Sequence, residues 1–200
     1  LPVLEASKGR AFVLFTSFRV MQQFEERLAD HEFHILMQGE TNKRDLLHEF
    51  VNTKNAVLLG TMSFWEGVDV PGDSLSCVII DKLPFESPFE PVLKARLNAM
   101  QEAGQNPFMN YQVPRAVTTL RQGSGRLIRS QYDKGVLMIC DARLRRTHYG
   151  KIFLNSLPPM RRTSDQSKVC GFLASVSQEV VSADSALSSN DLETSRVEES

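Results

Sequence analysis

Three polar residues at helical spacing, Gln122, Arg126 and Arg129, are the strongest candidates for chemistry in this sequence. On a helix they would fall within about 60° of one another, so that one face presents an amide and two guanidinium groups. Paired arginines suit a polyphosphate, because each guanidinium can donate two parallel hydrogen bonds to phosphate oxygens. Gly123 and Gly125 each cost about 1 kcal/mol relative to alanine inside a helix, which indicates close approach of a ligand to the backbone. A solvated basic helix face explains the arginines equally well at this point.

A second candidate is the loop at residues 60–72, which follows an apolar run typical of a buried strand. In a doubly wound sheet, ligands bind outside the carboxyl ends of the strands, where this loop must lie. Gly67 allows close approach of the backbone, and Asp69 could accept hydrogen bonds from ribose hydroxyls. Thr61 and Ser63 could donate their hydroxyl groups to a phosphate backbone. An ordinary turn is the alternative for this loop.

Thr16, Ser17 and Arg19 stand in the same position after the first apolar run. They offer two hydroxyls, a guanidinium and a helix N-terminus, which is a favourable place for an anion. A strand-to-helix cap explains Thr16 and Ser17 about as well.

Other kinds of site find little support in the sequence. The four histidines show no metal-ligand spacing, and the three cysteines lie too far apart for a zinc site or a disulfide framework. Neither a Gly-rich Lys-Ser/Thr loop nor a DExH-type acidic box occurs, so the chain lacks the parts that bind Mg-ATP and activate water. A small-molecule enzyme that uses Asp69 and Asp81 is disfavoured, because no GxGxxG turn follows a strand.

The elements that must position these residues alternate between short apolar runs and amphipathic segments. This alternation predicts an α/β fold with a parallel sheet covered by helices on both faces. Thr41 is the expected N-cap of the second helix. Strands are predicted at residues 11–17, 33–37, 56–60, 76–81 and 136–141, and helices at 18–30, 41–52, 91–103, 113–129 and 147–156.

Length and composition favour one globular domain. The chain has 200 residues, of which 42% are hydrophobic and 24% charged, with a net charge of -1. No apolar run approaches the roughly 20 residues that span a bilayer, and no secretory signal is visible, so we expect a cytoplasmic protein. Residues 175–200 contain eight serines and six acidic residues but one base, which predicts a disordered tail after a domain at 1–174.

Several motifs, in this order and spacing, carry a resemblance to a known family. They are Phe-Thr-Ser-Phe at 15–18, Gln-Gly at 38–39, Ile-Ile-Asp-Lys-Leu-Pro-Phe at 79–85, Asp-Ala-Arg at 141–143, Ser-Leu-Pro-Pro-Met-Arg-Arg-Thr at 156–163, and the stretches at 64–72 and 122–129. Over residues 1–174 the chain resembles the second RecA-like motor domain of superfamily 2 DNA helicases of the DinG/XPD family, in its bacterial DinG or YoaA-like branch. The resemblance implies a three-layer RecA-like fold with a mainly parallel central sheet.

The resemblance also implies roles for the candidate residues. Gln122, Arg126 and Arg129 match the motif whose arginines reach across an interdomain cleft to ATP phosphates. The residues that would contact or sense the nucleotide are Glu66, Gly67, Asp69 and Gly125. The residues that would hold the single strand are Thr16, Ser17, Arg19, Thr61 and Ser63.

Cofactors and partners follow from the resemblance as expectations. ATP and Mg²⁺ would be bound mainly by an N-terminal RecA-like domain of the same protein, which this chain lacks. An iron-sulfur cluster is expected in the full-length protein and not in this chain. Expected partners are single-stranded or forked DNA and replication or repair proteins, with no membrane. The alternative is a noncatalytic nucleic-acid or protein-binding module derived from this fold.

Overall fold

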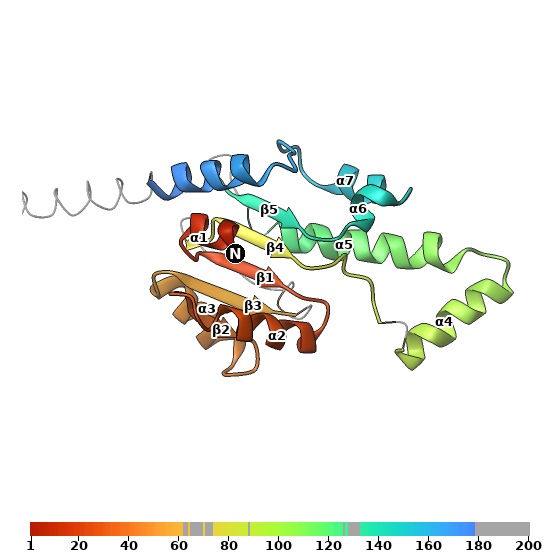
Figure 1. Ribbon diagram of the computed structural model, residues 1–200. Helices are drawn as coiled ribbons and strands as arrows, with labels where there is room; N and C mark the ends of the chain where they lie inside the picture. The colour runs from red at the N-terminus through yellow and green to blue at the C-terminus, as the bar shows by residue number, and fades with distance from the viewer. Residues whose placement is uncertain are drawn as a thin grey trace, which may run out of the picture.

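The centre of the molecule is a five-stranded, fully parallel sheet with the strand order β2-β3-β1-β4-β5 (Figure 1). The computed structural model describes residues 1–61, 64, 70, 74–87, 89–125, 127 and 133–178. Every predicted strand is confirmed, and the three central strands are buried at every residue, as expected for parallel strands covered on both faces. The strands are β1 (Ala11–Leu14), β2 (His34–Met37), β3 (Ala56–Gly60), β4 (Cys77–Ile80) and β5 (Val136–Ile139).

The carboxyl ends of the strands meet at one edge of the sheet. β1 lies in the middle, and its last residue, Leu14, is in register with Gly60 of β3 and Ile80 of β4. The chain therefore crosses β1 as it passes from β3 to β4. Such a reversal of strand order is where doubly wound sheets form their ligand sites.

Helices cover both faces of this sheet. Helices α3, α5 and α7 pack on one face, and α1, α2 and a helix at residues 166–178 pack on the other. No helix among the described residues has the length and apolar character needed to cross a membrane. The elements are α1 (Pro2–Ser7), α2 (Phe18–Leu28), α3 (Lys43–Asn52), α4 (Pro91–Glu102), the π-helix η3 (Phe108–Gln112), α5 (Val113–Ser124), α6 (Arg143–Arg146) and α7 (Gly150–Ser156).

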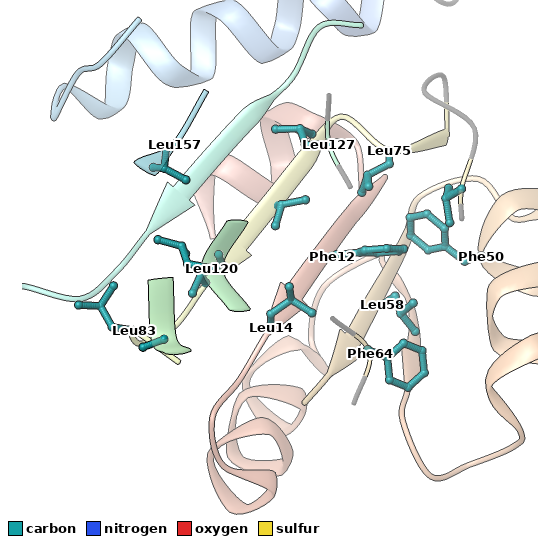
Figure 2. Packing of buried hydrophobic residues seen from close by; sticks show 14 of the residues in the cluster. Phe12, Leu14, Phe50, Leu58, Phe64, Leu75, Leu83, Leu120, Leu127 and Leu157 are labelled. Carbon is teal, nitrogen blue, oxygen red and sulfur yellow. The ribbon is translucent and has the colours of Figure 1, made fainter. Parts of the chain in front are cut away.

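The alternation of side chains along each strand divides the core between the two faces. Phe12 and Leu14 of β1 belong to the cluster beneath α3, α5 and α7 (Figure 2). Val13 and Phe15 belong to the cluster beneath α1, α2 and residues 166–178. The result is the expected three-layer architecture, in which each strand contributes to two hydrophobic clusters.

Three predicted helix limits differ from the structure. Asn42, and not Thr41, caps α3, because its Oδ1 accepts a hydrogen bond from the amide of Asp45 at 3.0 Å. Helix α5 ends at Ser124 and not at residue 129, since Gly125 forms its C-cap. The helix predicted at 147–156 is α7, which begins later, at Gly150, where a Cβ would collide with the carbonyl of Leu144 in the preceding short helix α6.

The domain continues beyond its predicted limit of residue 174. The helix at 166–178 was absent from the sequence prediction, yet Leu173 and Ser177 on it are 0% and 2% exposed. Arg10 also donates a hydrogen bond of 2.7 Å from Nη2 to the Ser177 hydroxyl. Residues 175–178 are thus part of the folded domain, and the rest of the predicted tail, 179–200, lies outside the described residues.

Candidate functional site

The first group of candidate residues lies where β1 and β3 end side by side. The amide of Phe15 donates a hydrogen bond of 2.8 Å to the carbonyl of Gly60, so Thr16 and Thr61 follow directly from two paired strand ends. Ser17 is the N-cap of α2, and Arg19 is exposed on the first turn of that helix. The structure therefore brings four of the predicted nucleic-acid residues to one edge of the sheet.

Ser17 occupies the N-cap position of α2, but its side chain leaves the helix start uncapped. Its backbone is extended, with φ -142° and ψ 128°, but its side chain makes no capping hydrogen bond. The first amides of an α-helix have no partner within the helix, and the positive end of the helix favours an anion. This helix start can thus donate both amide and hydroxyl hydrogen bonds to a phosphate group.

Thr61 is held by a residue for which the sequence suggested no role, Gln38 at the end of β2. The Oε1 atom of Gln38 accepts hydrogen bonds from the Thr61 amide and the Thr61 hydroxyl, both at 2.7 Å. The hydroxyl proton is therefore in use, and Thr61 could donate it to a phosphate only after this bond opens. The Gln-Gly pair directly after the second apolar run was the available signal, but the partner lies 23 residues further along the chain.

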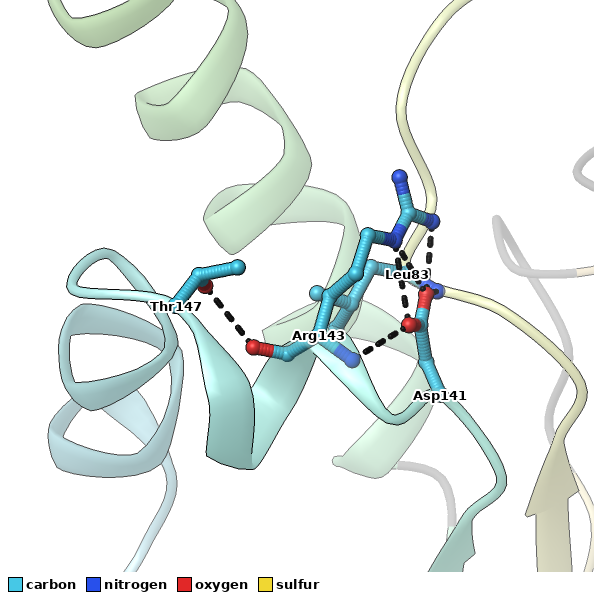
Figure 3. A network of polar contacts seen from close by, with 4 residues as sticks. All are labelled: Leu83, Asp141, Arg143 and Thr147. Carbon is cyan, nitrogen blue, oxygen red and sulfur yellow. Dashed lines mark hydrogen bonds and ion pairs between the residues drawn. The ribbon is translucent and has the colours of Figure 1, made fainter.

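A network of hydrogen bonds around Asp141 lies directly after β5, at the same edge of the sheet (Figure 3). The carboxylate of Asp141 accepts hydrogen bonds from the amides of Leu83 and Arg143, each at 2.9 Å, and from the Arg143 side chain at 2.6 to 3.0 Å. The Arg143 guanidinium lies 5.2 Å from the ring centre of Phe85. These contacts fasten the segment after β4 to the segment after β5.

We predict that replacing Asp141 by asparagine removes a pH-dependent part of the stability. Burial alone would raise the pKa of the Asp141 carboxyl, but the hydrogen bonds from Arg143 and the Leu83 amide outweigh it and hold that pKa below its usual value. A depressed pKa stabilises the fold above the carboxyl's unfolded pKa, and this contribution is lost as the pH falls through the folded pKa. Asp141→Asn should lower the free energy of unfolding by about 1 kcal/mol at neutral pH and less in acid. Urea unfolding of both proteins between pH 7 and pH 3 measures this, and a difference that stays constant with pH would contradict it.

The second group of candidate residues lies at the end of α5. Gln122 is exposed in the last turn, and Gly125 donates its amide hydrogen to the carbonyl of Arg121 at 2.9 Å. Helix α5 stops at Ser124, so of the helical face predicted for Gln122, Arg126 and Arg129 the described helix carries Gln122. The candidates that lie outside the described residues are Arg126, Arg129, Ser63, Glu66, Gly67 and Asp69.

Leu127, which lies between Arg126 and Arg129 in the sequence, packs against the start of the sheet. A Cβ on Gly135 would lie 2.5 Å from the Leu127 side chain and 2.9 Å from the Ser76 carbonyl. Leu127 therefore packs where β4 and β5 begin. Leu75, which precedes β4, is buried in the same cluster as Leu127 (Figure 2). Val70 belongs to this cluster as well.

The described ends of the connection between β3 and β4 lie at different places in the sheet. Thr61 lies at the carboxyl edge, where Gln38 holds it, and Ser76 lies at the start of β4, near Leu127.

A parallel sheet with this strand order and helices on both faces is the three-layer architecture expected of a RecA-like domain. Its sequence matches the profile described as Helicase C-terminal domain over residues 1–160. The chain belongs to this family of helicase C-terminal domains.

Individual proteins agree with this assignment. The chain is 53% identical over 174 residues to the ATP-dependent DNA helicase YoaA of Haemophilus influenzae, covering 86% of this chain and 27% of that protein. It is 42% identical over 155 residues to a Bacillus subtilis protein named 3′-5′ exonuclease DinG, covering 74% of this chain and 17% of that protein. A solved XPD helicase shares the fold with a TM-score of 0.58 at 19% identity, over 80% of this chain and 30% of that one. The chain therefore spans about a quarter of YoaA and less of DinG.

Proposed function

We propose that this chain is the C-terminal motor domain of an ATP-dependent DNA helicase, which couples ATP hydrolysis in an interdomain cleft to translocation on single-stranded DNA. The observation that carries the proposal is the carboxyl edge of the sheet, where Thr16 and Thr61 follow two paired strands and the helix start at Ser17 is uncapped. Such an edge offers hydrogen-bond donors to the phosphates of a nucleic-acid backbone.

On the nucleotide side, the arginines act on phosphates that another domain holds. Arg126 and Arg129, with Gln122, would stabilise the charge that develops as the terminal phosphate departs. Glu66, Gly67, Asp69 and Gly125 would contact or sense the nucleotide. When bound, Mg²⁺ neutralises phosphate charge, and we assign its ligands mainly to the preceding RecA-like domain.

The iron-sulfur cluster expected for the full-length protein does not fit this chain. Among the described residues, no three histidines, cysteines or carboxylates gather in a group that could bind a metal. Cys77 is buried, and burial raises the pKa of its thiol to about 12, which disfavours the thiolate that a cluster needs. We propose that another part of the full-length protein holds the cluster.

On the DNA side, Thr16, Ser17, Arg19, Thr61 and Ser63 would contact phosphates without reading the bases. Binding of this kind is independent of sequence and weakens as salt concentration rises. We propose that the substrate is single-stranded or forked DNA and that the protein moves along it in the 5′-to-3′ direction. We also propose that it acts with replication or repair proteins in the cytoplasm.

The test is unwinding of a forked DNA duplex by the full-length protein that carries this domain. We expect the protein to separate the two strands of the fork only with ATP and a single-stranded 5′ arm. A duplex with only a 3′ arm is the matched control and should remain paired. DNA binding without ATP hydrolysis or unwinding would overturn the proposal and favour a noncatalytic binding module.

A further inference from the structure

Phe18 is an exposed aromatic residue directly beside the hydroxyl pair Thr16 and Ser17. It is the first residue of α2, and 44% of its surface is exposed. A phenylalanine in such a position forgoes part of the free energy that full burial of its ring would supply. The phosphate contacts proposed for Thr16, Ser17 and Arg19 do not involve this ring.

The neighbour of the ring is a residue without a side chain. A Cβ on Gly39 would lie 3.6 Å from Cζ of Phe18. Gly39 has φ +108°, a conformation that other residues rarely adopt, so the turn after β2 keeps this neighbour bare. Glu40 fixes the same turn by accepting a hydrogen bond of 3.0 Å from the Met37 amide.

At the carboxyl edge, the partly exposed ring of Phe18 lies against the turn after β2. Groups that can bind phosphates lie next to it in the sequence. Ser17 directly precedes the ring, and Arg19 directly follows it and is exposed. Base stacking and backbone contacts occur together in proteins that bind single strands without reading their sequence. A ring beside a phosphate site can meet the base of the nucleotide whose phosphate is held there.

We propose that Phe18 is a base-stacking residue for single-stranded DNA, which rests on the function proposed above. The ring would contribute a contact that tolerates any base, because every base has an aromatic face. It would hold the nucleotide next to the helix start of α2 while the phosphate contacts open and close. The single strand would then be bound by stacking as well as by charge.

The experiment uses the full-length protein and an oligothymidine that carries one 2-aminopurine. Phe18→Ala should raise the Kd about tenfold and abolish the quenching of 2-aminopurine fluorescence, whereas Phe18→Trp should keep both near wild type. Phe172→Ala is the matched control, because Phe172 is 42% exposed but lies on the helix at 166–178, away from this edge. It should leave Kd and quenching unchanged.

Salt dependence separates stacking from charge. Phe18→Ala should weaken binding without changing the slope of log Kd against log salt, whereas Arg19→Ala should lower that slope. Wild-type Kd and quenching in Phe18→Ala would overturn the proposal, and a loss of ATP hydrolysis with intact DNA binding would place the ring against another protein domain. If the wild-type protein binds no single strand, the proposed function fails first and this inference with it.

Discussion

Replacing Arg126 by alanine in the full-length protein will abolish ATP hydrolysis and leave ATP binding nearly unchanged. An arginine that meets charge developing in the transition state contributes little to binding of the ground state. Arginine fingers in related chemistry contribute roughly 10³ to 10⁵ in kcat, so residual hydrolysis should fall below detection. The measurements are single-turnover hydrolysis at saturating single-stranded DNA and the Kd of a fluorescent ATP analogue.

Arg121→Ala supplies the matched control for Arg126→Ala. Arg121 is an exposed arginine in the last turn of α5, and nothing in the account gives it a role in the cleft. Its loss should leave both hydrolysis and ATP binding intact. If Arg126→Ala folds normally but loses ATP binding, the arginine acts on the ground state, and the finger assignment is wrong.

Replacing Gly135 by alanine is expected to destabilise the domain by about 3 kcal/mol, the upper part of the usual range for overpacking a core. The added methyl group would lie 2.5 Å from Leu127, which is 3% exposed, and 2.9 Å from the backbone oxygen of Ser76. Neither neighbour can withdraw into solvent, so Leu127 must move. Because Leu127 lies between Arg126 and Arg129 in the sequence, hydrolysis should fall together with stability. Urea unfolding and ATP hydrolysis of the same preparation measure the two effects.

Gly171→Ala is the control for the glycine substitution. A Cβ on Gly171 would meet no atom within 4 Å, and the residue is exposed within the helix at 166–178. Alanine should therefore stabilise this helix by up to about 1 kcal/mol. Unchanged stability in Gly135→Ala would mean that Leu127 and Ser76 do not confine this position, and would contradict the prediction.

The strands of the sheet were predicted well, because a buried parallel strand is a short apolar run. Such a run can be recognised in the sequence without knowing which strands lie beside it. The sequence predicted the end of α5 poorly. The spacing of Gln122, Arg126 and Arg129 suggested a continuing helix, but two glycines close to one another favour a helix end, and the C-cap forms at Gly125. It also missed the helix at 166–178, whose buried face is formed by Leu173, Val176 and a serine that bonds to Arg10.

Only part of the candidate site could be predicted, because the sequence shows where strands end but not which residues meet across the fold. Thr16, Ser17 and Thr61 could be placed at one edge because each follows a recognisable strand. The Gln38 contact with Thr61 and the Asp141 contact with Leu83 could not, since they join residues 23 and 58 positions apart. Hydrogen bonds of this kind depend on strand order, and the alternation of strands and helices does not specify that order.

The most direct test of the central claim is steady-state ATP hydrolysis by the full-length protein, with and without single-stranded DNA, beside the isolated 200-residue chain. If this domain supplies arginines to a nucleotide held elsewhere, the full-length protein hydrolyses ATP and single-stranded DNA accelerates it strongly, whereas the isolated chain hydrolyses none. Hydrolysis by the isolated chain, or a full-length rate that DNA leaves unchanged, would contradict the account.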